Sequence, residues 1–371
     1  MDTRHFDALG KLLSTSNSRR WLATLMVTLP AAGGMRELLS PVEVKGKRRK
    51  KKHKKPTPAP SCTPDPKDQT CAGQCGNVTN NCQQVVDCGA CVCDVRCNDI
   101  PAVCGAALQA AIDAAAEGDT LIVCPGTYRG GFTIDKALTV IGAGEGNNPA
   151  RDTILDGNTT QRVLQIPRGT GTVTLRRLRI ARGNAGIDGG GGITNSGTRL
   201  VMRDCTVADN QGRTGGGVSH DIGALEMTRC TVRDNVAPSV GGGGATGGGL
   251  HLTGEATLTD CLVATNASEV LGGGIYIGAS YPVILAGTTV VRDNTASQGG
   301  GIFADNASLT VGANCRVTHN TANPGNGGGL RQDFSTVTLE GPDPSPIVVD
   351  NCHENCVGGV GKCAPGGTCP A

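Results

Sequence analysis

Three aspartates that share one position in a repeated motif are the residues best suited to bind a metal ion. Asp209, Asp234 and Asp293 each stand directly before an asparagine that recurs along the chain. Carboxylates brought together by a repeat could form a weak site for Ca²⁺, because hard cations prefer oxygen ligands. Arginines one residue earlier, Arg233 and Arg292, could neutralise the same carboxylates instead. The sequence favours a solvated polar edge, so no cofactor is expected other than this candidate Ca²⁺.

No set of residues in the sequence predicts catalysis. A glycoside hydrolase needs two carboxyl groups that flank the scissile bond. A polysaccharide lyase needs a base together with acidic calcium ligands. The chain has no Asp-Asp pair and no Gly-His-Gly motif, and the histidines of its main body stand in unlike contexts: His220, His251, His319 and His353. We therefore predict no catalytic residue.

Two aromatic residues at matching positions are candidates for sugar binding. Tyr276 and Phe303 each directly follow a Gly-Gly-Gly-Ile sequence. Equivalent positions of a repeat lie on neighbouring strands, so the two rings are expected to stack. Exposed rings often serve as platforms for sugars, but a stacked pair also stabilises a sheet by itself. The sequence favours the structural role.

The recurring asparagine belongs to a repeat of 25–31 residues. Segments such as CTVADN (205–210) and CTVRDN (230–235) end on it, and a shifted copy, LRIARGN (178–184), comes before them. A glycine cluster and then an apolar residue follow each copy except the last. Stacked asparagines can hydrogen-bond to the backbone and to one another. We therefore predict an asparagine ladder of Asn184, Asn210, Asn235, Asn266, Asn294, Asn320 and Asn351.

Apolar residues alternate within each repeat, which is typical of strands with one buried face. Leu200, Met202, Cys205 and Val207 show the pattern. No helical pattern of ten residues separates the strands, and the Leu/Asn scaffold of leucine-rich repeats is missing. Each repeat is therefore predicted to form one rung of a parallel β-solenoid, with equivalent positions stacked about 4.8 Å apart. The expected fold is an all-β, single-stranded parallel β-helix over residues 104–351.

Four cysteines recur at equivalent positions and are expected to form a column that points into the core: Cys205, Cys230, Cys261 and Cys315. Neighbouring rungs bring Cα atoms close enough for a disulfide. Cys315 has no cysteine in the rung before it, because Thr289 takes that position. Buried free thiols are therefore favoured over disulfides.

Both ends of the solenoid carry sequences that could cover its open edge. Residues 106–116, AALQAAIDAAA, favour a capping helix that stops at Gly118. Cys104 and Cys124 bracket this stretch and are candidates for a disulfide that fixes the cap. Residues 352–371 contain four cysteines and are expected to form a stapled C-terminal cap or tail.

The first 103 residues are predicted to hold an export signal, a linker and a small cysteine-rich module. In residues 1–34, Arg19 and Arg20 precede a short apolar run and several small residues, which resembles a twin-arginine signal. Residues 35–61 are a basic, proline-rich segment that we expect to be disordered. Its block from Lys45 to Lys55 holds nine Lys or Arg and could contact polyanions, although a soluble tether is favoured. Residues 62–103 hold eight cysteines, for which disulfides are favoured over zinc.

The composition excludes several classes of protein. Glycine fills 57 of the 371 positions without a three-residue period, which excludes collagen. Phe, Tyr and Trp together number only eight, so a compact core built on large rings is not expected. The 18 cysteines favour an oxidising compartment, in agreement with export. No segment of the mature chain reaches transmembrane length, so we expect a secreted or cell-surface protein.

Two stretches of sequence resemble known families. Residues 106–144, AALQAAIDAAAEGDTLIVCPGTYRGGFTIDKALTVIGAG, resemble the opening of right-handed parallel β-helix proteins of the pectin-lyase-like class. The GGGI-type clusters with VxxN segments resemble the repeats of bacterial polymorphic outer-membrane proteins. Those repeats usually have Phe where this chain has Val207 or Val232. The resemblance implies a right-handed β-helix in a secreted or surface-exposed bacterial protein, with roles that range from sugar cleavage to adhesion.

The function expected from the sequence is that of a secreted or cell-surface β-helix scaffold or adhesion module without catalysis. The alternative is a polysaccharide lyase or glycoside hydrolase whose site has diverged. Cell-envelope polymers or polysaccharides are the expected partners, and the protein is expected to be a monomer.

Overall fold

A computed structural model provides the three-dimensional structure. It describes residues 77–79, 85–87, 102–103 and 108–358, apart from 198, 240–242, 279, 342–346 and 352–353. The chain divides into two compact units, Met1–Ser61 and Cys62–Ala371, and every described residue belongs to the second. The predicted export signal, the basic block and Cys104 lie outside the described residues, as do residues 359–371. The predictions made for them stay predictions.

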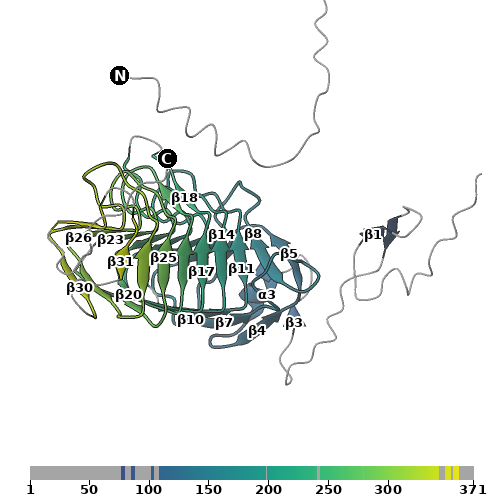
Figure 1. The fold of residues 1–371 in the computed structure, drawn as a ribbon. Coiled ribbons are helices and arrows are strands. Elements are labelled where there is room, and N and C mark those ends of the chain that lie inside the picture. Colours follow the sequence, from purple (N-terminus) through teal and green to yellow (C-terminus); the bar gives the residue numbers. More distant parts are fainter. Residues whose placement is uncertain are drawn as a thin grey trace, which may run out of the picture. The chain divides into compact units, whose positions relative to one another are not determined.

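The main body is a stack of rungs, each contributing one strand to each of three parallel sheets (Figure 1). Each strand pairs with its counterparts in the rungs before and after it. Val173, for example, pairs with Leu200, which pairs with Leu225. This pairing confirms the predicted all-β parallel β-helix.

We name the sheets in the order in which the chain first enters them. Sheet 1 consists of β3 (Ala102–Val103), β4 (Thr120–Val123), β7 (Leu138–Ile141), β10 (Val173–Arg176), β13 (Leu200–Arg203), β16 (Ala224–Thr228), β20 (Glu255–Thr259), β24 (Pro282–Ala286), β27 (Ser308–Val311) and β30 (Thr336–Leu339). Sheet 2 consists of β5 (Gly126–Arg129), β8 (Thr153–Asp156), β11 (Arg179–Ala181), β14 (Thr206–Ala208), β17 (Thr231–Arg233), β21 (Leu262–Ala264), β25 (Val290–Arg292), β28 (Arg316–Thr318) and β31 (Val348–Val349). Sheet 3 consists of β6 (Phe132–Thr133), β9 (Leu164–Ile166), β12 (Ile193–Asn195), β15 (Val218–His220), β19 (Leu250–Leu252), β23 (Ile275–Gly278), β26 (Ile302–Asp305), β29 (Leu330–Asp333) and β32 (Cys356–Val357).

Two short pairs lie apart from these sheets. β18 (Val236–Ala237) and β22 (Ala267–Ser268) pair in parallel after sheet 2. In the predicted cysteine-rich module, β1 (Asn77–Thr79) and β2 (Val85–Asp87) form an antiparallel pair. The solenoid pairing begins with β3 and ends with β32, so it extends slightly beyond the predicted limits of 104 and 351. Backbone pairing needs no repeat motif, which is why the sequence pattern ends earlier than the strands do.

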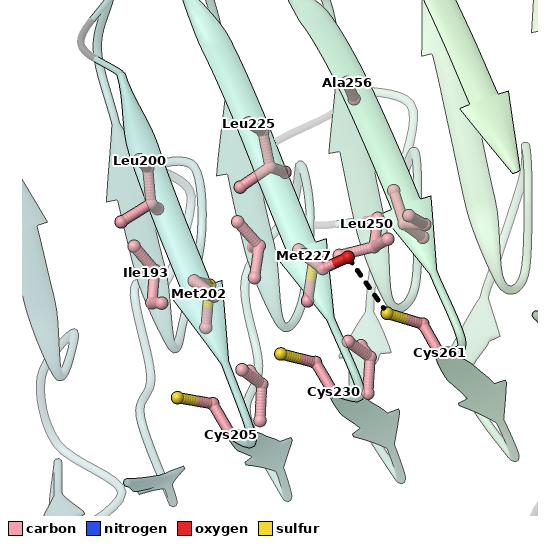
Figure 2. Packing of buried hydrophobic residues seen from close by; sticks show 14 of the residues in the cluster. Ile193, Leu200, Met202, Cys205, Leu225, Met227, Cys230, Leu250, Ala256 and Cys261 are labelled. Carbon is pink, nitrogen blue, oxygen red and sulfur yellow. Dashed lines mark hydrogen bonds between the residues drawn. The ribbon is translucent and has the colours of Figure 1, made fainter. Parts of the chain in front are cut away.

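Alternate residues of the strands point into the solenoid and stack in columns (Figure 2). Leu200, Leu225 and Ala256 occupy one such column, and none of them is more than 1% exposed. Met202 and Met227 are neighbours in the next column. The core is a single narrow stack, so medium-sized side chains fill it and few large rings are needed.

The predicted cysteine column lies in this core. Cys205, Cys230, Cys261 and Cys315 are buried free thiols, and Figure 2 shows the first three on successive rungs. Thr289 fills the rung before Cys315, where its hydroxyl accepts a hydrogen bond from the backbone N–H of Cys261 at 3.1 Å. Hydrogen bonding with Cys205, together with burial, raises the pKa of Cys230 far above its usual range. These thiols therefore act as small apolar residues and not as nucleophiles.

Six of the seven predicted asparagines form a buried ladder. Asn235 is typical: its Nδ2 donates to the Val207 carbonyl at 3.0 Å and to Oδ1 of Asn266 at 2.9 Å. Its Oδ1 accepts from the backbone N and the Nδ2 of Asn210, both at 3.0 Å. The same pattern continues from rung to rung as far as Asn351, whose Nδ2 donates to Oδ1 of Asn355 at 3.0 Å.

The assignment of Asn184 to the ladder was wrong. Gly183 takes the ladder position in that rung, and its N–H donates to Oδ1 of Asn210 at 2.8 Å. Asn184 lies one residue further on, is only half-buried, and accepts from the N–H of Gly186 at 2.9 Å. The copy that ends at Asn184 is one residue longer than the others, so its asparagine misses the column.

A short helix covers the first rung, as the alanine-rich sequence predicted. α3 spans Leu108–Ala114 and buries Leu108 and Ile112. Its Gln109 side chain donates to the carbonyl of Thr133 at 3.1 Å and accepts from the N–H of Thr133 at 2.9 Å. The helix thereby satisfies backbone groups of β6, which would otherwise be an open sheet edge. Cys124 is buried and is not a free thiol, but the pairing with Cys104 stays a prediction.

Candidate functional site

Charge is distributed unevenly along the solenoid. Residues 120–240 hold 14 Lys and Arg against 10 Asp and Glu, whereas residues 241–351 hold three against nine. The rungs of the first half are therefore basic, and those of the second half are acidic. A field of this kind attracts anions to the N-terminal rungs.

A groove on the outer face of sheet 1 lies within these basic rungs. It has a volume of about 420 Å³. Arg176 and Arg203 are neighbours at the ends of β10 and β13, and Arg199 lies directly before β13. The remaining lining residues lie in β7, β10, β13 and β16 or directly before β10: Thr139, Thr172, Thr174, Val201 and Glu226. We call this the arginine groove.

The three arginines of the groove differ in how they are engaged. Arg199 is bonded to Glu226. Among the described residues, neither Arg176 nor Arg203 has a hydrogen-bond acceptor or an ion-pair partner. The pKa of nearby Asp204 is lowered, first by a hydrogen bond from Arg229 and further by the charges of arginines that include Arg176. Two free guanidinium groups in a positive field can bind carboxylate or sulfate groups in a bidentate way.

Arg176 and Arg203 are not among the residues predicted from the sequence. Acids and aromatic rings were the predicted candidates, because those residues mark known types of sugar site. Arg176 and Arg203 do share one offset, since each stands two residues before the core position taken by Leu178 and Cys205. That shared offset was the signal that could have found them.

The three aspartates that were weak candidates for metal binding are each engaged by an arginine. Asp209 accepts a hydrogen bond from Arg179 at 2.7 Å. Asp234 and Asp293 are bonded to the arginines that precede them, Arg233 and Arg292. The described residues contain no group of three or more His, Cys, Asp or Glu side chains placed to hold a metal ion.

A backbone requirement explains this column of aspartates. The residue before each ladder position has a left-handed conformation, with φ between 54° and 61°: Arg182, Asp209, Asp234, Thr265, Asp293, His319 and Asp350. Asp, Asn and His tolerate positive φ better than most residues. These residues therefore allow the chain to turn directly after each strand of sheet 2. The sequence pattern did not predict this role.

The two aromatic residues stack as predicted, and the column is longer than expected. The ring of Tyr276 lies 6.0 Å from that of Phe303 and 4.9 Å from that of His251, with all three nearly parallel. Arg331 covers the other side of Phe303, with its guanidinium carbon 5.8 Å from the ring centre. The Tyr276 hydroxyl donates to Asp305 at 3.3 Å. The ring faces are covered by neighbouring rings and by Arg331, so they are not open to a sugar. This arrangement fits the structural role.

His251 should make the protein sensitive to acid. Burial lowers the pKa of His251 to about 4, whereas an unfolded histidine titrates near 6.5. Between these two pH values His251 is protonated in the unfolded chain but neutral in the folded chain. The free energy of unfolding therefore decreases as the pH falls from about 6.5 towards 4. We expect His251→Phe, which keeps a ring in the stack, to reduce the fall in melting temperature over this range. His319→Gln, at an exposed site, should leave it unchanged; an equal reduction in both variants would contradict this explanation.

Comparisons with known proteins show little similarity in sequence. No family model and no curated protein match the chain. Among solved structures, the rice weevil pectin methyl esterase is similar with a TM-score of 0.34 and 10% identity, over 62% of this chain and 84% of that one. An alginate lyase from Paenibacillus is similar with a TM-score of 0.27 and 12% identity, over 62% of this chain and 94% of that one. In the described part of the chain, no helix is long and apolar enough to cross a membrane. The strand pairing itself establishes the parallel β-helix.

Proposed function

We propose that the protein is a secreted or cell-surface β-helix scaffold that binds an anionic polysaccharide without cleaving it. The observation that carries this proposal is the arginine groove, in which Arg176 and Arg203 face outward from neighbouring strands without acceptors among the described residues.

The groove suits a linear polymer that carries regularly spaced acidic groups. Rungs of the solenoid repeat about every 4.8 Å, so a chain lying along the axis presents successive units to successive strands. Arginine binds carboxylate and sulfate groups through two parallel hydrogen bonds. The hydroxyls of Thr139, Thr172 and Thr174 line the same groove and can both donate to and accept from sugar hydroxyls.

The test removes the two free arginines together. We expect Arg176→Gln/Arg203→Gln to weaken binding of the full chain to polygalacturonate about tenfold or more, because each charged hydrogen bond contributes about 1.5–3 kcal/mol. The dependence of binding on salt should also become weaker. Affinity would be measured by calorimetry at several salt concentrations.

A matched control removes the same charge from the acidic half of the solenoid. Arg292→Gln/Arg316→Gln takes away two exposed arginines of sheet 2 and should leave affinity nearly unchanged. Equal losses in the two double variants would show that only net charge matters. Equal binding of polygalacturonate and a neutral galactan by the wild-type chain would overturn the proposal.

One observation supports a second candidate function, that of a polysaccharide lyase or glycoside hydrolase. Asp156 and Asp209 line one hollow of sheet 2 together with Arg179, and two carboxylates in one hollow are what a hydrolase needs. Each of these carboxylates, however, lies against an arginine: Asp156 against Arg182 at 3.4 Å and Asp209 against Arg179 at 2.7 Å. Both carboxylates are therefore already engaged in ion pairs, which favours binding over cleavage.

A further inference from the structure

A second hollow lies on the outer face of sheet 2, beneath the longest connection between sheets 1 and 2 in the first five rungs. Residues 142–152 join β7 to β8, whereas residues 177–178 and 204–205 suffice in the next two rungs. Asn147 and Pro149 of this loop form one wall of the hollow, which has a volume of about 250 Å³. The loop is held in place by Asp152, whose carboxylate accepts from the backbone N–H of Asn148 at 2.9 Å. A long and well-fixed loop beside connections of two residues is typical of a functional site.

The hollow contains an arginine that is buried and incompletely bonded. The side chain of Arg179 is only 5% exposed, although it stands at an outward position of β11. Neighbouring rungs have Ile154 and Thr206 at that position. Among the described residues its one acceptor is Asp209, at 2.7 Å, and its Nε has none. A guanidinium carries five N–H donors, so most of its capacity for hydrogen bonds is unused.

The charges around Arg179 leave an excess of one positive charge. Arg129 and Arg182 also line the hollow, opposite the two carboxylates of Asp156 and Asp209. The Asp156 side chain is 3% exposed and lies 3.4 Å from Arg182 and 4.0 Å from Arg129. The side chains of Arg129 and Arg182 are 70% and 47% exposed, so solvent screens their charges. Arg179 is the buried cation of the hollow, and a buried charge is costly unless partners compensate it. A bound monoanion would balance the charge and supply the missing acceptors.

We propose that this hollow binds one small hydroxycarboxylate, such as a single sugar acid. The carboxylate of the ligand accepts hydrogen bonds from Arg179 and Arg182, and its hydroxyl groups donate to Asp156 and Asp209. The volume of about 250 Å³ corresponds to about eight water molecules at about 30 Å³ each in the liquid. The hollow therefore has room for one six-membered sugar ring. The inference does not depend on the arginine groove, which lies on a different sheet.

The test measures binding of free D-galacturonate to the full chain by calorimetry and by saturation-transfer NMR. D-galactose and inorganic phosphate serve as ligands that each lack one half of the proposed chemistry. We expect galacturonate to bind at least tenfold more tightly than either. Galacturonate trimer distinguishes the source of the ligand: tighter binding than the monomer indicates the end of a polymer, and equal binding indicates the free acid.

Variants locate the site. Arg179→Lys keeps the charge but loses the planar fork, so it should weaken galacturonate binding about tenfold or more. Asn147→Ala, on the exposed loop, should weaken it several-fold without affecting folding, and it decides the matter if Arg179→Lys does not fold. Arg316→Lys is the matched control, because Arg316 occupies the same column of sheet 2 five rungs later.

Three results would overturn the inference. The first is that galacturonate does not bind at millimolar concentration. The second is that Arg179→Lys and Asn147→Ala leave its binding unchanged. The third is that phosphate or galactose binds as tightly as galacturonate. The Arg176→Gln/Arg203→Gln variant should keep full affinity for the monomer. Failure of this inference is therefore distinguishable from failure of the proposed function, which concerns the polymer.

Discussion

Replacing Asn235 with alanine is expected to lower the free energy of unfolding by about 4 kcal/mol, because each buried group left without a partner costs about 1–3 kcal/mol. The Asn235 side chain is fully buried and takes part in four hydrogen bonds. Alanine leaves the carbonyl of Val207 and the backbone N–H of Asn210 without these partners. The substitution also divides the ladder into two shorter pieces. Hydrogen bonds along such a stack strengthen one another, so the division adds to the loss of stability.

Chemical denaturation followed by circular dichroism measures this loss. Asn184→Ala is the matched control, because Asn184 ends the same sequence motif but lies outside the buried ladder. We expect the control to lose about 1 kcal/mol or less, the typical contribution of one half-exposed hydrogen bond. Similar losses in the two variants would mean that the ladder does not stabilise the solenoid.

Replacing Gly248 with alanine is also expected to be strongly destabilising, with a loss of about 3 kcal/mol or more, or a failure to fold. A Cβ atom at this position would lie closer than 3.0 Å to the carbonyl oxygens of Ala267 and Gly273. Both are backbone atoms of the next rung, so neither can rotate away. The clash is therefore relieved only by separating the rungs.

Gly244 belongs to the same glycine-rich segment and provides the control. A Cβ atom there would meet nothing within 4 Å. Gly244→Ala should be neutral or slightly stabilising, because alanine restricts the unfolded chain. Melting temperatures of the two variants would decide the matter. If Gly248→Ala melted like the wild type, the rungs would not pack as closely as described.

The solenoid was predictable because its physics is repeated in every rung. Leu200, Met202 and Val207 alternate with outward residues, and the asparagine spacing gives the length of one rung. Asn184 shows the limit of such counting. One extra residue in its copy moved the side chain out of the column, because the position in a stack is set by strand register and not by the order of residues in the motif.

The candidate site was less predictable, because it depends on which outward residues become neighbours. Arg176 and Arg203 are 27 positions apart in sequence, and only the strand register brings them together. The 142–152 loop contributes Asn147 to the second hollow from outside the repeat altogether. Asp209 was identified as part of a polar edge that arginines could neutralise, but its partner and its backbone conformation were not. Its partner, Arg179, comes from the preceding rung, and the positive φ of Asp209 is a property of the bend.

The central claim is that the protein binds an anionic polysaccharide and leaves it intact. The most direct measurement incubates the full chain with polygalacturonate, with and without Ca²⁺, and determines both the bound fraction and the length of the polymer by size-exclusion chromatography with light scattering. We predict salt-sensitive binding and an unchanged polymer length. Shortening of the polymer, lost on Asp156→Asn or Asp209→Asn, would contradict the claim and establish an enzyme.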